Sequence, residues 1–174
     1  GLRTFRYVRD RHVGLAHALA VDPAYREVRV NGQRLSMFLV HECLNQIIAD
    51  AKRLGDGPAL GMVNEVESPR LMEHYKHNGI LELPVKYVEP VFPAEEQGRS
   101  REQEIALIDF FPMFLGFLPD GALGETQTYT SQMVGDFSLA FLVDHYGLPI
   151  HHPKVQAVLD SIPVMFRRLE WNLR

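Results

Sequence analysis

The chain has 174 residues, 46% of them apolar and 23% charged, which is the composition of an ordinary globular protein. Its 18 Lys and Arg against 22 Asp and Glu give a net charge of −4, so nucleic acid and anionic membranes, which are bound through basic surface, are not expected as partners. The single Cys43 excludes an internal disulfide and favours a cytoplasmic location, and no apolar run predicts a membrane span or a signal peptide.

The first half of the chain predicts a strand–helix–strand unit. Residues 4–9 alternate apolar and polar and predict a short strand. Residues 13–21 carry apolar side chains on both faces, small ones on one of them, which predicts a central strand that a helix approaches closely. Apolar positions at helical spacing predict a long helix over residues 33–53, and residues 59–66 predict a second central strand. We expect the two central strands to be parallel.

The middle of the chain predicts a short helix and an antiparallel pair. Ser68 and Pro69 are typical of the first positions of a helix, which we expect to run to His77. Residues 80–92 predict a strand interrupted at a proline, and residues 104–111 predict a second strand that pairs with it.

Two helices are expected near the C-terminus, over residues 131–146 and 153–171. The stretch 116–124 contains glycine and proline and predicts a linker. We therefore expect a core over residues 1–118 and a helical C-terminal extension over residues 119–174, packed on that core.

A basic segment lies between the first central strand and the long helix. The candidate cofactor-binding residues of this segment are Val21, Arg26, Arg29, Val30, Asn31, Gly32, Gln33 and Arg34. The first amides of a helix have no acceptor within the helix, and the helix dipole makes that end positive. A glycine lets an anion approach the backbone, and arginines add charge, so the segment predicts a pyrophosphate site. A turn with solvated arginines is the alternative.

In order and spacing, the segments over about residues 12–111 resemble the GNAT superfamily of acetyl-coenzyme A-dependent N-acetyltransferases. Residues 21–26 resemble the V-x-P-x-x-R segment of that family, and residues 29–34 resemble its Q/R-x-x-G-x-G/A loop. Residues 68–80 resemble its N-x-x-A-x-x-x-Y-x-x-x-G-F segment. The chain departs from the family pattern at Arg34, Ser68, Leu71 and Ile80, where the family has a small residue, Asn, Ala and Phe.

The resemblance implies an α/β fold, with a GNAT-like mixed sheet whose central strands are parallel, plus the helical C-terminal extension. It implies an enzyme that transfers an acetyl group from acetyl-coenzyme A, its cosubstrate, to a primary amine of a small molecule or a peptide. It also implies that Ser68 and Arg70 help to bind acetyl-coenzyme A. A non-catalytic acyl-coenzyme A-binding or protein-interaction module with the same fold is the alternative.

The N-terminal strand and helices of the family have no counterpart in this sequence, which we expect to start after them. Their place on the sheet is then open for the apolar C-terminal helices. Those helices could instead pack on a second chain, in a homodimer, because large apolar patches are rare on monomers.

Acyl transfer to an amine needs a base and an acid. A lysine-like amine is uncharged in only about one molecule in 2,500 at pH 7, so a carboxylate is expected nearby. Glu65 and Glu67 share one face at the end of the second central strand, where ligand crevices of α/β proteins open. Glu65 is the predicted base, with solvated strand-end carboxylates as the alternative. The resemblance implies that Tyr75 protonates the departing thiolate, and a core tyrosine is the alternative.

No metal site is predicted. His74 and His77 lie three residues apart, and further histidines follow Asp144, but the chain has no HExxH motif and one cysteine.

Overall fold

The computed structural model describes residues 1–94, 100–121 and 130–164 and shows a mixed α/β protein. Its main sheet has six strands: β1 (Leu2–Val8), β2 (Val13–Ala20), β5 (Gly61–Val66), β6 (Leu81–Glu82), β7 (Tyr87–Val91) and β8 (Asp109–Pro119). The strand order is β1-β2-β5-β8-β6, and β7 pairs with the first half of β8. Strands β2 and β5 are parallel, as predicted, and the other pairs are antiparallel.

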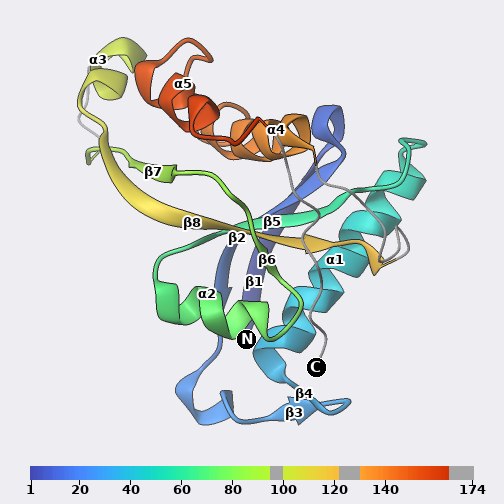
Figure 1. Cartoon of the computed structure of the whole chain (residues 1–174). Helices are drawn as coiled ribbons and strands as arrows, with labels where there is room; N and C mark the ends of the chain where they lie inside the picture. Colours follow the sequence, from blue (N-terminus) through green and yellow to red (C-terminus); the bar gives the residue numbers. More distant parts are fainter. Residues whose placement is uncertain (95–99, 122–129, 165–174) are drawn as a thin grey trace.

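Helices cover both faces of the sheet (Figure 1). Helices α1 (Leu35–Arg53) and α2 (Pro69–Lys76) lie on one face, and α4 (Ser131–Leu142) and α5 (Pro153–Asp160) lie on the other. A short helix, α3 (Arg101–Ala106), precedes β8. Among the described residues no helix is both long and apolar enough to cross a membrane.

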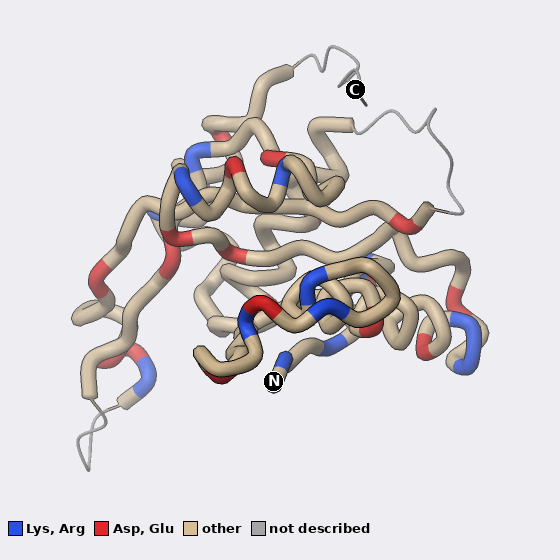
Figure 2. Tube along the Cα trace, turned by 90° about the horizontal axis from the view of Figure 1, so that it is seen from below, with Lys and Arg blue, Asp and Glu red and all other residues tan. Residues whose placement is uncertain are grey.

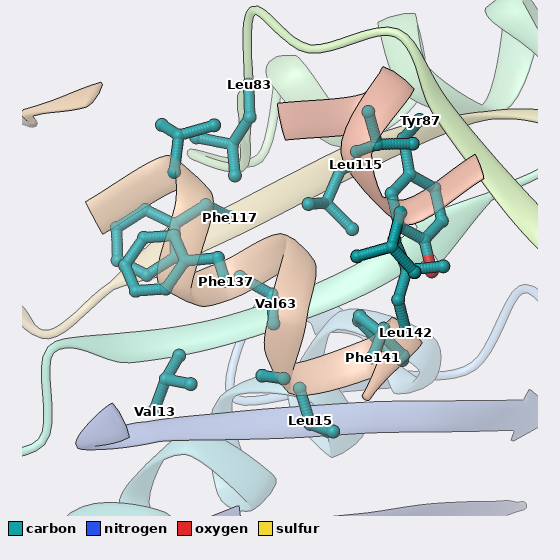
Figure 3. Close-up of a cluster of buried hydrophobic side chains, with 14 of the residues drawn as sticks. Val13, Leu15, Val63, Leu83, Tyr87, Leu115, Phe117, Phe137, Phe141 and Leu142 are labelled. Carbon is teal, nitrogen blue, oxygen red and sulfur yellow. The ribbon is translucent and has the colours of Figure 1, made fainter. Parts of the chain in front are cut away.

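The sheet separates two hydrophobic cores. On the α1–α2 face, Met37, Val40 and Ile47 of α1 pack with Met62 of β5 and are at most 3% exposed. On the α4 face, the core joins β2, β5 and β8 to α4, as Figure 3 shows. There the rings of Phe117 and Phe137 stack with their centroids 4.7 Å apart. Side chains on both sides of the predicted boundary at residues 118 and 119 therefore share one core.

The small face of β2 brings α1 close to the sheet, as its sequence predicted. A Cβ on Gly14 would lie 2.1 Å from Cδ1 of Ile47. The start of α2 is also as predicted, because the Ser68 hydroxyl accepts a hydrogen bond from the Leu71 amide at 3.3 Å. The predicted helix start at Gln33 is wrong by two residues, since α1 begins at Leu35.

The largest errors of the sequence prediction lie between residues 101 and 124. Residues 101–106 are helical, held by a capping box of Ser100 and Gln103, so the predicted strand over 104–111 is wrong in its first half. The strand is β8, and it includes part of the stretch predicted as a linker. Gly116 lies opposite Asn64 inside the sheet. The predicted antiparallel pairing is confirmed with these shifted bounds, since β7 pairs with β8.

The C-terminal helices are shorter than predicted. Helix α4 ends at Leu142 and α5 at Asp160. The predicted continuation over 165–171 lies outside the described residues.

Candidate functional site

The parallel pair β2 and β5 is hydrogen-bonded over only part of its length. The last pair in register is Ala16 opposite Asn64, whereas β2 continues to Ala20 and β5 to Val66. Ligands of open α/β sheets bind beside the carboxyl ends of such strands. The candidate site is built around this gap.

Three adjoining cavities lead away from the gap. The first, here called the sheet cavity, has a volume of about 310 Å³ and lies between the ends of β2 and β5. The middle cavity, of about 480 Å³, shares Leu19, Leu71 and Tyr75 with it. The hairpin cavity, of about 320 Å³, shares Arg34 and His74 with the middle cavity. Because neighbouring cavities share lining residues, the three follow one another in a row from the gap between β2 and β5 to the segment before α1.

Glu65 forms part of the wall of the sheet cavity and is partly buried. Its Oε1 accepts a hydrogen bond from Tyr87 Oη at 2.5 Å, and its Oε2 accepts one from Tyr146 Oη at 2.7 Å. Burial raises the pKa of Glu65 to about 7, against the two hydrogen bonds, which favour the carboxylate. A carboxyl group with this pKa is suited to accept a proton near neutral pH. The alternative of a solvated carboxylate is wrong for Glu65, whereas Glu67 is exposed.

The two tyrosines reach Glu65 from distant parts of the chain. Tyr87 begins β7 and is 1% exposed, and Tyr146 follows α4. Burial and the nearby negative charge raise the pKa of both phenols, so both remain protonated donors. Tyr146 Oη also lies 3.3 Å from Oε1 of Glu89, whose side chain lines the same cavity.

Tyr75 lies on α2 where the sheet cavity and the middle cavity meet. It is also a member of the core on the α1–α2 face and is 9% exposed. Glu65, through Tyr87, contacts the core on the opposite face. The predicted base and the predicted acid therefore approach the gap from opposite sides of the sheet.

Residues 29–34 form a β-hairpin, with β3 (Arg29–Val30) and β4 (Gln33–Arg34). Its turn residues Asn31 and Gly32 have φ angles of 51° and 81°, which is the backbone of a tight hairpin turn. Arg29 Nη1 donates to the Gly32 carbonyl at 2.8 Å. Glycine is therefore needed at position 32 by the turn itself, and its predicted contact with a phosphate stays a prediction.

The basic residues of this segment line the outer two cavities. Arg26 lines the middle cavity, Arg29 lines the hairpin cavity, and Arg34 lines both. Arg34 is the last residue before α1, and its Nη2 lies 3.2 Å from Oε2 of the exposed Glu27. An exposed pair of this kind contributes little and leaves the guanidinium accessible. Seen from below, Figure 2 shows positive charges near one another in the segment between β2 and α1, with negative charge between them.

The other predicted cofactor residues divide into two groups. Val21 lines the middle cavity and Gln33 the hairpin cavity. Four residues do not line any of these three cavities: Val30, Asn31, Ser68 and Arg70.

Sequence reasoning missed four residues of the site: Arg3, Tyr87, Glu89 and Tyr146. His17, which the sequence pattern did not assign to the site, also lines the sheet cavity, and its ring lies 4.0 Å from that of His145. Burial, and then the neighbouring His145, lower the pKa of His17 to about 4. Within the described ranges of the chain, no three His, Cys, Asp or Glu side chains lie close enough together to hold a metal ion.

Comparison with known proteins adds no relative. No family model matches the sequence, and neither a curated protein nor a solved structure matches the chain.

Proposed function

We propose that the chain is a GNAT-type acyltransferase that transfers an acetyl group from acetyl-coenzyme A to a primary amine. The observation that carries the proposal is the row of three adjoining cavities. It begins at the gap between two parallel strands, passes Tyr75 and ends at the arginines before α1. Coenzyme A has a long neutral arm and a phosphorylated nucleotide, so a narrow slot followed by cations and helix amides suits it.

The reaction uses the two sides of the gap. The uncharged amine attacks the carbonyl carbon of the thioester, a C–N bond forms and the C–S bond breaks. Glu65 takes the proton that the nitrogen loses, and Tyr75 gives its proton to the departing sulfur. Because these side chains approach from opposite faces, the amine and the thioester can meet in the gap.

Tyr87 and Tyr146 act as positioning residues in this proposal. Each occupies one oxygen of Glu65, so the carboxylate is held in one orientation. Proton transfer to Glu65 therefore uses the remaining lone pairs of its oxygens.

The non-catalytic alternative is a module that binds acyl-coenzyme A without transferring the acyl group. The hydrogen bonds of Tyr87 and Tyr146 to Glu65 favour this alternative, because both oxygens of a catalytic base would already be occupied. The two functions differ in turnover and agree in cofactor binding, so they are separated by measuring both.

Calorimetric titration with coenzyme A tests the shared part of both proposals. We expect binding to the native chain, weakened about ten-fold or more when Arg26 and Arg34 are both replaced by Gln, since two charge-assisted contacts are lost. Arg53→Gln is the matched control, because Arg53 is an exposed arginine at the other end of α1. Absence of binding by the native chain contradicts both proposals.

Turnover is measured as thiol release from acetyl-coenzyme A in the presence of a panel of primary amines. Release that depends on both substrates and is lost in Glu65→Gln supports acetyl transfer. Tight coenzyme A binding without release, over the whole panel, supports the binding module.

A further inference from the structure

Arg3, on β1, lies in the wall of the sheet cavity. Its Nε is buried and has no hydrogen-bond partner among the described residues. The polar groups that influence it most are those of Tyr75 on α2 and Cys43 on α1, neither of which is a carboxylate. Within the described part of the chain, Arg3 forms no ion pair.

The lack of a carboxylate partner is unusual for a guanidinium partly withdrawn from water. Burial is the main cause that lowers the pKa of Arg3, and hydrogen bonding with Tyr75 and Cys43 opposes that effect only in part. Arg11, by contrast, is a partly buried arginine with carboxylate partners. Its side chain is 17% exposed and is paired with Asp136 and Asp144. A buried cation is normally paired with an anion or placed against a ligand. Among the described residues no carboxylate lies within ion-pair distance of Arg3, and Arg3 faces a cavity.

We propose that Arg3 binds a carboxylate carried by one of the two substrates of the sheet cavity. The inference rests on the proposed function, which places the acyl group and the acceptor amine there. A guanidinium matches a carboxylate through two parallel hydrogen bonds, which gives orientation as well as affinity. The substrate pair therefore has a carboxylate next to the reacting centre, and unsubstituted alkylamines with acetyl-coenzyme A are poor substrates.

The carboxylate could belong to either substrate. Arg3 lies beside Tyr75, where the proposal places the thioester. This suits a donor whose acyl group, unlike acetyl, ends in a carboxylate, and in that case this donor takes the place of acetyl-coenzyme A in the proposed reaction. Glu65, Glu67 and Glu89 line the same cavity and attract an ammonium group, and this suits an amino acid whose carboxylate reaches Arg3. Both sources make the same contact with Arg3.

Two pairs of probes distinguish the sources, and each pair differs only by a carboxylate. The donor arm compares the dissociation constants of succinyl-coenzyme A and butyryl-coenzyme A. The acceptor arm compares 4-aminobutyrate with butylamine, with and without saturating coenzyme A. Both arms use the full chain, the Arg3→Gln variant and the Arg53→Gln control.

In one arm we expect the carboxylate probe to bind about ten-fold or more tightly than its partner. The preference disappears in Arg3→Gln and persists in Arg53→Gln. No preference in either arm of the native chain overturns the Arg3 proposal, and this comparison needs no variant that might fail to fold. If coenzyme A does not bind, the proposed function fails, while the acceptor arm without coenzyme A still decides whether Arg3 binds a carboxylate.

Discussion

The Tyr146 hydroxyl donates a hydrogen bond to Glu65 at 2.7 Å and so joins two residues that are 81 positions apart. Glu65 lies on β5 in the centre of the sheet, and Tyr146 lies just after α4. The contact makes the C-terminal helices part of the candidate site as well as part of the core.

Replacing Tyr146 by Phe removes a donor that favours the charged form of Glu65. We therefore expect the pKa of Glu65 to rise from about 7, by about one unit or more, because hydrogen bonds to charged groups are strong. Carboxyl NMR of labelled glutamate measures this pKa directly. Tyr25→Phe is the control, since Tyr25 is 57% exposed on the surface. An unchanged pKa in Tyr146→Phe would show that the hydrogen bond has no influence on the carboxylate.

The raised pKa of Glu65 also predicts how stability depends on pH. In the unfolded chain this carboxyl titrates near its ordinary value of 4.5, and in the folded chain near 7. Between these pH values the folded state binds more protons, so the free energy of unfolding falls as the pH rises through this window. The free energy of unfolding of the native chain should fall by about 3 kcal/mol over this window, and we expect no such fall in Glu65→Gln. Denaturant titrations of both proteins at pH 4.5 and pH 8 give the difference.

The Tyr75→Phe variant tests whether Tyr75 is the general acid that protonates the departing sulfur. We expect turnover to fall roughly 100-fold or more, the usual scale for a lost general acid, with coenzyme A affinity nearly unchanged. The assignment is falsified if the purified variant acetylates the same amine at the native rate. Calorimetry on the same sample shows whether its cofactor site is intact.

Gly14→Ala tests the close approach of α1 to β2. The added Cβ would lie 2.1 Å from Cδ1 of Ile47, so α1 or the Ile47 side chain must shift. We expect a loss of about 1–3 kcal/mol in the free energy of unfolding, partly recovered by Ile47→Val. Gly57→Ala is the control, because nothing lies within 4 Å of its added Cβ. Equal stability of the two alanine variants would contradict this packing.

Ending the chain after Gly124 removes α4 and α5. Phe137 and Phe141 of α4 are fully buried against the sheet, and each contributes roughly 1.5–3 kcal/mol through burial. We expect the truncated chain to expose the α4 face of the sheet and to aggregate. Size-exclusion chromatography and thermal melting measure this outcome. A soluble, monomeric and equally heat-stable product would show that the C-terminal helices are an independent appendage.

Much of the fold follows from local patterns. The two parallel strands and α1 have strong apolar periodicity, and Ser68 with Pro69 marks the start of α2. The pattern fails at β8 because Gly116 and Pro119, typical of loops, lie within this strand. Asn64 and Ile80 lie so close to Gly116 that a Cβ there would be 3.0–3.2 Å from their side-chain atoms. This close approach explains the glycine, and only the tertiary structure reveals it.

The sequence predicts fewer of the residues of the candidate site than of the elements of the fold. Glu65 and Tyr75 were singled out because strand ends and a motif point to them. Arg3 and Tyr146 were not, since each lies outside the segment that resembles a family, and their contacts span the whole chain. A charged residue within an edge strand gave no local signal that its Nε is buried without a partner.

Because Tyr146 lies near the C-terminal end of the chain, it is synthesised later than Glu65 and Tyr87. A nascent chain that has emerged as far as residue 121 already contains β1 to β8, both helices of the α1–α2 face, and Glu65 with Tyr87. The second phenol arrives only with the residues after α4. Because a domain generally folds as a unit, and α4 shares a core with β2, β5 and β8, Glu65 acquires both of its donors only late in synthesis.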